Sequence, residues 1–375
     1  MKCIIAPDKF KGSLTALEAS RAMEAGIREI MPHAEILAFP MADGGDGFAA
    51  VMGGYLQPEH ISCPSQDAIG RPCMAGYGLI PGNHTAIIEV ATASGLAQLA
   101  PHEYDALHAS TYGTGLLIQH AMDRGASSIL LGLGGSATTD MGMGILQALG
   151  FVFADDNGGI LTACGASLSQ ICSVNIPHPF PQVKFIMACD VFNPLCGPNG
   201  AAFVYAPQKG ADTTMVKQLD EGLDHANRIF GNYSGKDFSI LPGSGAAGGI
   251  AAGLAHFFEV DIQSGFDLVL QESGMEKELS GAAWLLTGEG RFDAQSFEGK
   301  VTGKLIELAK KHEVKCAVFC GVSHVETMRE SISGLDFLSS LVQHDCDENK
   351  AKEFAFQCLK DRVSSFTQQW AAGLI

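Results

Sequence analysis

Residues 127–144 read SSILLGLGGSATTDMGMG. The segment 127–133 is a short apolar run, which is typical of a buried strand. The loop 132–144 that follows contains five glycines together with serine, threonine and aspartate. Residues 145–149 then predict a short helix that ends at Gly150. A strand, a glycine loop and a helix in this order predict an α/β unit whose loop N–H groups can bind an anion, most often phosphate.

Two other interpretations of this loop stay open. Its glycines could simply serve a tight turn or close backbone packing. Residues 132–137 also match the dinucleotide fingerprint with alanine in the last place, and acidic residues 155–156 lie about twenty positions further on. We disfavour a dinucleotide site because 153–161, FADDNGGIL, is typical of a hairpin and not of a parallel strand end. The P-loop motif and the protein-kinase signature set are both missing from the sequence.

Composition sets further bounds. The chain has 375 residues, 46% of them hydrophobic and 17% charged, which predicts a globular protein with room for two domains. Its net charge of −17 argues against nucleic acid or an anionic membrane as a partner. We see neither a signal peptide nor an apolar run of the ~20 residues that a bilayer span needs. Eleven cysteines without a CxxC motif indicate reduced thiols in a cytoplasmic protein.

The two ends of the chain share one pattern. Near the N-terminus, CIIAP predicts a strand, Thr15 and Glu18 form a capping box that opens a helix, and 33–40 predicts a second strand. Near the C-terminus, strands are expected at 282–290, 315–322 and 337–342, and helices at 302–312 and 349–371. Polar loops follow the strands, which is where open α/β sheets bind ligands.

The middle of the chain is more mixed. It predicts a helix at 114–124, a hairpin at 151–162, strands at 184–191 and 201–207, and an amphipathic helix at 213–230. This contrast with the α/β ends indicates one domain inserted into another.

Polar, glycine-rich segments recur along the whole chain. In order they are APDKFKGSLTA, PMADGGDG, EVATASGL, STYGTGLLI, GLGGSATTD, DVFNPLCG, PQKGA, PGSGAAGG and TGEGRFDAQSFEGK. This ordered set resembles the signature blocks of the bacterial glycerate kinase family of type I, and it extends from residue 4 to about residue 345.

The resemblance implies a two-domain α/β fold. Residues 1–75 plus 282–375 would form a flavodoxin-like α/β domain, and 76–281 would form an inserted, mixed α/β domain, with the active site in the cleft between them. It also implies ATP-dependent phosphorylation of D-glycerate with Mg²⁺. The 2-hydroxyl is the expected acceptor, which would give 2-phosphoglycerate, and 3-phosphoglycerate is the alternative product.

Candidate site residues follow from these loops. Asp190 ends an apolar strand, so we expect it to act as the base or to orient the substrate hydroxyl, and Lys11 is expected to stabilise phosphate charge. Asp293 and Asp43 are the candidate Mg²⁺ ligands. Residues expected to bind substrate or nucleotide are Asp8, Lys9, Ser13, Gly44, Gly45, Gly134, Gly135, Ser136, Asn193, Glu289, Arg291 and Lys300. An internal ion-pair cluster is the alternative for 289–300, and simple turn or capping roles are the alternatives for Asp8 and Asp43.

Two alternative functions remain. The chain could phosphorylate another small hydroxy acid, or it could bind a nucleotide without catalysis. Small molecules are the expected partners in each case, and a homodimer is one expected assembly.

Overall fold

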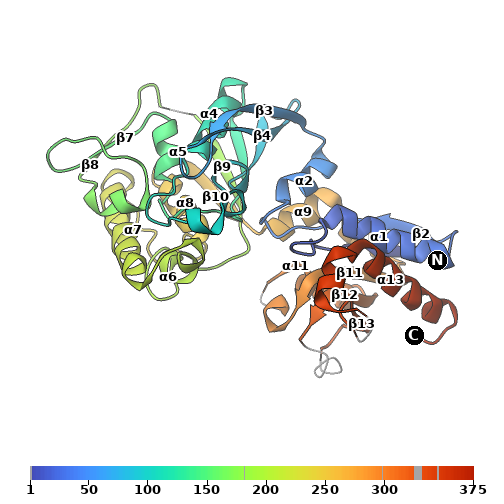
Figure 1. Ribbon diagram of the computed structural model, residues 1–375. Coiled ribbons are helices and arrows are strands. Elements are labelled where there is room, and N and C mark those ends of the chain that lie inside the picture. The colour runs from blue at the N-terminus through green and yellow to red at the C-terminus, as the bar shows by residue number, and fades with distance from the viewer. Residues whose placement is uncertain (1, 181, 298, 325–331, 344–345) are drawn as a thin grey trace. The chain divides into compact units, whose positions relative to one another are not determined.

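The computed structural model describes residues 2–180, 182–297, 299–324, 332–343 and 346–375. Contacts divide the chain into two compact units (Figure 1). Unit 1 combines Met1–Asp43 with Phe266–Ile375, and unit 2 is Gly44–Gly265.

Unit 1 is built around a five-stranded parallel sheet with the order β13-β12-β11-β1-β2. Its strands are β1 (Lys2–Ile5), β2 (Glu35–Ala38), β11 (Trp284–Phe292), β12 (Lys315–Ser323) and β13 (Phe337–Ser340). Its helices are α1 (Ala16–Ile30), α9 (Gly265–Ser273), α10 (Met275–Glu278), α11 (Val301–Lys311), α12 (Glu348–Glu353), α13 (Ala355–Ala371) and the 3-10 turn η6 (Ala294–Phe297).

This strand order is the flavodoxin-like one, because the chain moves outward from β1 in one direction to β2 and in the other through β11 to β13. Loops therefore diverge where the carboxyl ends of β1 and β11 lie side by side. In open α/β sheets a ligand binds at such a switch point. The topology confirms the expected flavodoxin-like class for the part of the chain that includes both termini.

Helices α1 and α13 lie side by side in Figure 1. Gly26 permits this approach, because a Cβ there would lie 2.6 Å from the Lys360 carbonyl oxygen. Their apolar faces cover Trp284 and Phe319 of the sheet, and Phe366 contacts both rings edge to face. The predicted capping box of α1 is confirmed.

Unit 2 contains a six-stranded mixed sheet with the order β10-β9-β6-β5-β4-β3. Its strands are β3 (Glu59–Gln66), β4 (Pro72–Ile80), β5 (Thr85–Glu89), β6 (Ser128–Gly132), β9 (Lys184–Ala188), β10 (Glu259–Gln263) and the separate pair β7 (Val152–Ala154) and β8 (Ser173–Asn175). Strands β5, β6, β9 and β10 are parallel, whereas β3 and β4 are antiparallel additions.

The helices of unit 2 surround this sheet and share one large apolar core with it. The α-helices are α2 (Phe48–Leu56), α3 (Ala91–Ser94), α4 (Tyr112–Asp123), α5 (Met143–Ala148), α6 (Ala201–Tyr205), α7 (Thr213–Ser234) and α8 (Ile250–Ala255). The 3-10 turns are η1 (Leu96–Gln98), η2 (Pro101–Glu103), η3 (Gly165–Gln170), η4 (Pro207–Lys209) and η5 (Ala246–Gly248). The predicted sequence of strand β6, glycine loop and helix α5 is confirmed.

Three expectations differ from the structure. The segment 201–207 was expected as a strand, but it forms α6 and η4. The expected hairpin at 151–162 is present as an antiparallel bridge between Ala154 and Ile160, but β7 also pairs with β8, which was not expected. The contact division at 43/44 and 265/266 also differs from the expected boundaries at 75/76 and 281/282, because β3 and β4 pair within the sheet of unit 2.

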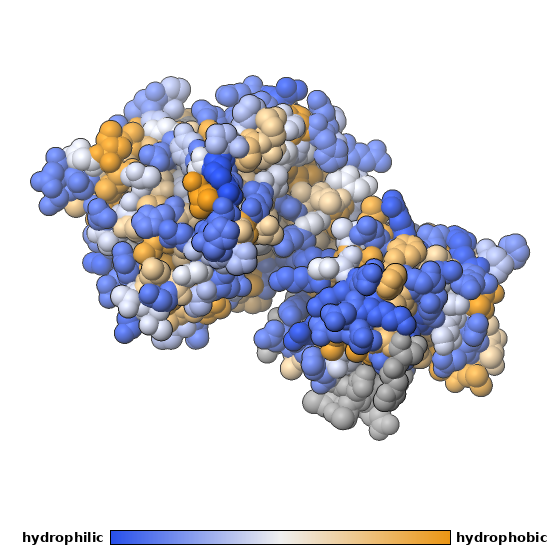
Figure 2. Space-filling model, in the orientation of Figure 1, coloured by the Kyte–Doolittle hydropathy of each residue, from blue (hydrophilic) through white to orange (hydrophobic). Residues whose placement is uncertain are grey.

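Hydrophilic residues dominate the visible surface, and the apolar patches on it are small and separate (Figure 2). Among the described residues, every helix is too short or too polar to cross a bilayer.

Candidate active site

The carboxyl ends of β1, β11 and β12 border a pocket of about 340 Å³ in unit 1. Five of the predicted site residues line it: Lys11, Ser13, Arg291, Asp293 and Lys300. Lys11 and Ser13 come from the loop after β1, and the other three from β11 and the loop that follows it. The sequence prediction that these two loops share one site is therefore consistent with the structure.

Cations outnumber acids around this pocket. Lys11, Arg291, Lys300 and Lys352 line it, against only two acids, Asp293 and Glu348. The chain as a whole carries −17, so this local excess of positive charge runs against the overall charge. Such a pocket can attract an anion that the rest of the surface would repel.

Helix α11 adds a further positive element. Lys300 occupies its N-cap position, and the Lys300 side chain makes no capping hydrogen bond. The first N–H groups of a helix and the helix dipole both favour an anion at this end. Lys300 lines the pocket, so a phosphate held there would meet an ammonium group beside a helix N-terminus.

A cluster of carboxylates lies next to these loops. Burial, together with the nearby carboxylates of Asp43 and Glu289, raises the pKa of Asp8 to about 7, although Lys9 opposes the shift. The Lys9 ammonium pairs with an Asp43 oxygen at 3.2 Å. The structure thus brings together four residues that the sequence placed on three separate loops.

Glu289 connects this cluster to the pocket. Burial raises the pKa of its carboxyl, the neighbouring hydroxyl groups of Ser296 and Thr302 and the charge of Lys300 lower it, and Asp293 raises it. Its Oε1 is buried and accepts no hydrogen bond from the described residues. A buried carboxylate oxygen without a donor is costly, and a cation or a ligand donor would stabilise it.

These residues fit a Mg²⁺ ion that is shared with a ligand. Among the described residues, no group of three or more His, Cys, Asp or Glu side chains is placed to hold a metal alone. Mg²⁺ commonly uses one or two carboxylates, with phosphate oxygens and waters as its other ligands. Asp293 on the pocket wall and the orphaned Glu289 oxygen beside it supply the matching donor set.

The other predicted residues belong to unit 2, where β5, β6 and β9 end in register at Glu89, Gly132 and Ala188. The Gly134 N–H donates to the Gly44 carbonyl at 3.2 Å. A Cβ on Gly134 would overlap Gly45, and one on Gly135 would overlap the Asp46 carboxylate. The structure therefore shows close packing of two glycine loops, while the predicted role of the loop in ligand binding stays a prediction.

Asp190 and Asn193 follow β9. Asp190 is half-buried, two residues beyond the end of the strand. The Asn193 amide donates to the Asn199 carbonyl at 2.9 Å, and the side-chain oxygen of Asn193 accepts from the Tyr205 hydroxyl at 2.6 Å. The Asn193 side chain thus stabilises the conformation of the loop in which it lies. Ser136 is buried and shares a hydrogen bond of 2.8 Å with Thr138.

The sequence prediction missed two buried charges, Lys209 next to the 132–144 loop and Asp140 within it. Lys209 is 2% exposed, and its ammonium donates to the Thr138 carbonyl. Burial lowers the pKa of Lys209 to about 8, and Asp140 opposes that shift. Asp140 is fully buried and accepts from the N–H and hydroxyl of Thr111, both at 2.8 Å. The PQKGA and GLGGSATTD motifs contain both charges, but nothing in them signals burial.

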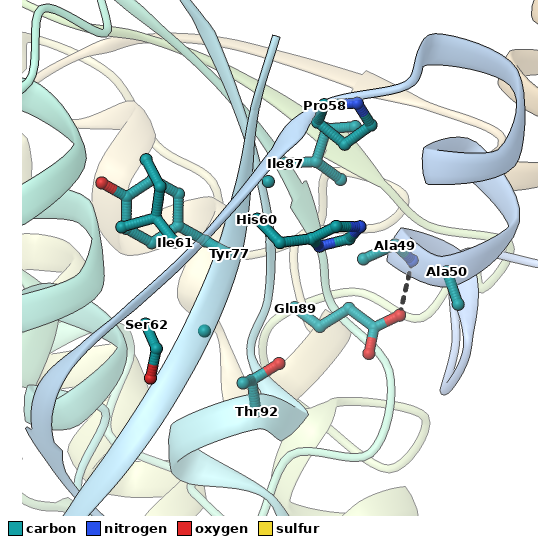
Figure 3. A pocket seen from close by; sticks show the side chains of 12 residues that line it. Ala49, Ala50, Pro58, His60, Ile61, Ser62, Tyr77, Ile87, Glu89 and Thr92 are labelled. Atoms are coloured by element: carbon teal, nitrogen blue, oxygen red, sulfur yellow. Dashed lines mark hydrogen bonds between the residues drawn. The ribbon is translucent and has the colours of Figure 1, made fainter.

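Glu89 was also missed. Its carboxylate accepts a hydrogen bond of 2.6 Å from the Ala49 N–H, in the first turn of α2. Glu89 and His60 point together toward this helix start, beside a cavity of about 330 Å³ (Figure 3). Gly47 provides no side-chain cap, so a strand residue of unit 2 caps this helix instead.

Comparison with known proteins identifies the family. The sequence model of the Glycerate kinase family matches residues 3–371. The chain belongs to the glycerate kinase family. It is 40% identical to a glycerate kinase of Halalkalibacterium halodurans, over 85% of this chain and 84% of that protein. It is 39% identical to the glycerate 2-kinase of Escherichia coli K12, over 83% of each chain.

A solved structure agrees with this assignment. The chain matches the crystal structure of a Salmonella typhimurium LT2 protein proposed to be a glycerate kinase 2, with a TM-score of 0.84 and 35% identity. The match covers 100% of this chain and 99% of the other. This member of the glycerate kinase family is a kinase, and its two-domain α/β fold is the fold expected from the sequence.

Proposed function

We propose that this protein, as a type I glycerate kinase, transfers the γ-phosphoryl group of ATP to D-glycerate in the cytoplasm. The 2-hydroxyl is the proposed acceptor, and 2-phosphoglycerate the product. Membership in the glycerate kinase family supports the reaction class. The Escherichia coli relative is called a glycerate 2-kinase, which supports the choice of hydroxyl.

One observation carries the proposal: the cationic pocket at the switch point of unit 1. Phosphoryl transfer needs positive groups around the transferred phosphate and little other protein chemistry. Lys11, Arg291 and Lys300 provide those groups, and the N-terminus of α11 adds backbone donors. Ser13 lines the same pocket, and its hydroxyl donates to the Phe10 carbonyl at 3.0 Å, which stabilises the loop that carries Lys11.

We propose that Mg²⁺ binds at Asp293 on the pocket wall, with the buried Glu289 oxygen and Asp43, which lies outside the pocket lining, as candidates for a second ligand. The ion would neutralise charge on the phosphates. These acids lie near other carboxylates. Beyond the effect of burial, the Asp43 carboxylate raises the pKa of Asp8, and the Asp293 carboxylate raises the pKa of Glu289. Lys9 holds the Asp43 side chain in place.

Asp190 is the proposed base. In this step the glycerate hydroxyl oxygen attacks the γ-phosphorus, its proton passes to the Asp190 carboxylate, and ADP leaves with the electrons of the broken P–O bond. The backbone N–H groups at 134–136 are proposed to bind an anionic group, either phosphate or the glycerate carboxylate.

A coupled assay with ATP, Mg²⁺ and D-glycerate tests the reaction, and ³¹P NMR of the product distinguishes 2- from 3-phosphoglycerate. A higher kcat/KM for lactate, tartronate or a sugar acid than for D-glycerate would identify that acid as the substrate. Nucleotide binding without turnover on any of these acids would indicate a non-catalytic protein.

The Asp190→Asn variant tests the base. We expect kcat to fall by about 10²–10⁴-fold, while ATP affinity and melting temperature stay close to wild type. Near-normal turnover in this variant would exclude Asp190 as the base.

A further inference from the structure

The pocket in unit 1 has two chemically different halves. The charged side chains Lys11, Arg291 and Lys300 come from the loops after β1 and from β11 with the loop that follows it. On the side of β12, β13 and α12 the lining has an apolar wall of Val322, Leu341, Val342 and Ala351, bordered by Glu348 and Lys352. The cationic half is used in the proposed function, and the apolar half has no role in it.

We propose that this apolar half is a subsite for the planar base of the nucleoside triphosphate. The inference rests on the proposed function, since it assumes that the cationic half holds the polyphosphate. Of the two proposed substrates, glycerate is small and polar throughout. Only the nucleotide has a large apolar face, so only its base matches a wall of valine, leucine and alanine.

The spacing of the strands sets the distance between the cationic and the apolar half of the pocket. Neighbouring strands lie about 4.8 Å apart, so β13 is roughly 10 Å from β11 along the sheet edge. The strand order β13-β12-β11 therefore places Val322 one strand, and Leu341 and Val342 two strands, away from β11, whose following loop holds Asp293 and Lys300. A nucleoside triphosphate has the same layout, with an anionic end and a ring at the other end. The pocket volume of about 340 Å³ lies within the usual range for ligand sites.

Backbone hydrogen bonds hold the apolar wall in place. The Val342 N–H donates to the Gly321 carbonyl at 3.0 Å, and the Leu341 N–H donates to the Cys320 carbonyl at 2.8 Å. The Ser340 hydroxyl donates to the same Gly321 carbonyl at 3.0 Å. These contacts extend the β12–β13 pairing past its last strand residue, so the wall is formed before a ligand arrives.

Helix α12 closes the subsite with a small residue and a polar edge. Ala351 is buried and lines the pocket, and a larger side chain at this position would occupy the space. Glu348 and Lys352 flank it on the same lining and form an ion pair at 2.9 Å. One acceptor and one donor therefore border the apolar wall, which suits the polar rim of a nitrogenous base.

The test compares two ligands that differ only in the presence of the nucleoside. Calorimetric titrations of the full chain would use ATP and inorganic tripolyphosphate, each with Mg²⁺. We expect wild type to bind ATP at least about tenfold more tightly than tripolyphosphate, because only ATP buries an apolar ring. Equal affinities would overturn the base subsite. Failure of both ligands to bind would overturn the proposed function itself.

Ala351→Phe fills the subsite without changing charge. It should weaken ATP binding about tenfold or more and leave tripolyphosphate binding unchanged, which also shows that the variant is folded. Ala371→Phe, at an exposed alanine at the end of α13, is the matched control and should leave both affinities unchanged.

Val342→Thr is a second, nearly isosteric variant in case Ala351→Phe does not fold. It should weaken ATP binding alone, since it makes the wall polar without closing it. A parallel loss of ATP and tripolyphosphate affinity in a folded variant would contradict the proposal.

Discussion

The ammonium group of Lys209 donates a hydrogen bond to the backbone carbonyl of Thr138, and both groups are buried. A short turn after α6 thereby anchors the 132–144 loop from behind. Asp140, two residues beyond Thr138, supplies the opposite charge. This loop carries the N–H groups for which we propose an anion-binding role.

Lys209→Met should therefore weaken the fold. Methionine has a similar length but no donor, so the Thr138 carbonyl loses its hydrogen bond and a positive charge near Asp140 is removed. We expect the free energy of unfolding to fall by about 1–3 kcal/mol, measured by denaturant titration at pH 7. Lys217→Met, at an exposed lysine of α7, should change it by less than about 0.5 kcal/mol. Equal stability of the two variants would contradict an anchoring role for Lys209.

Gly135→Ala tests the packing of the two glycine loops of unit 2. Gly135 has a φ of +72°, and its Cβ would collide with the Asp46 carboxylate. Gly70, with a φ of +85°, has open space around it. Gly70→Ala should thus cost only the left-handed backbone penalty of about 1–2 kcal/mol, and Gly135→Ala should cost clearly more.

Thermal melts of both variants, beside calorimetric titration with ATP and glycerate, separate packing from binding. Packing predicts lower stability for Gly135→Ala with normal binding by the folded fraction. If Gly135→Ala melts like Gly70→Ala but binds ATP or glycerate weakly, the interpretation of this loop as an anion-binding loop is the better one.

The buried His256 makes stability depend on pH. Its Nε2 donates to Asn227 Oδ1 at 3.0 Å, because that oxygen can only accept. In the neutral ring Nδ1 then accepts from the Ser234 hydroxyl at 2.8 Å. Burial lowers its pKa from 6.5 to about 4, Asp237 opposes the shift and Lys236 adds to it.

The unfolded chain binds a proton at His256 below pH 6.5, whereas the folded chain does so only near pH 4. The stabilisation is thus complete above pH 6.5 and is lost as the pH falls toward 4, by about 3 kcal/mol in all. His256→Gln should lower the overall stability but show a flatter decline across this window. If the free energy of unfolding falls equally with pH in wild type and in His256→Gln, His256 is not the cause of the pH dependence.

Asp293→Ala and Lys300→Ala should differ in their response to Mg²⁺. Asp293 is the proposed metal ligand, so its loss should raise the Mg²⁺ concentration for half-maximal rate, and excess Mg²⁺ should restore part of the activity. Lys300→Ala removes a phosphate donor and should raise the KM for ATP without such rescue. Identical Mg²⁺ titrations for wild type and Asp293→Ala would favour the ion-pair interpretation of this loop.

Local signals predicted the first unit well. The capping box of Thr15 and Glu18 was readable because it depends on residues three apart. The pocket residues from Lys11 to Lys300 were predictable as a group, because parallel strands bring their carboxyl-end loops to one edge. Sequence alone could not reveal the burial of Glu289, which depends on packing against η6 and α11.

Other features had no local signal. Phe203 and Val204 favour strands by propensity, yet they lie in α6, where Ala201 and Ala202 face the core and decide the conformation. Strand β3 alternates in burial, but its segment EHISCPSQ has few apolar residues and a proline, so it was not recognised. Missing this strand moved the expected domain boundary. The burial of Lys209 depends on a partner 71 positions away.

The order of strands in unit 1 also has a consequence for synthesis. Strand β1 pairs with β11, and the Thr287 hydroxyl donates to the carbonyl of Ala6, 281 positions earlier. At a translation rate of about 5–20 residues per second, β1 waits roughly 15–55 s for this partner to be made. Unit 2 is continuous in sequence and can fold during that interval. The N-terminal strand and helix α1 are therefore the segments most dependent on chaperones or on fast translation, because their apolar faces stay uncovered until the last third of the chain has left the ribosome.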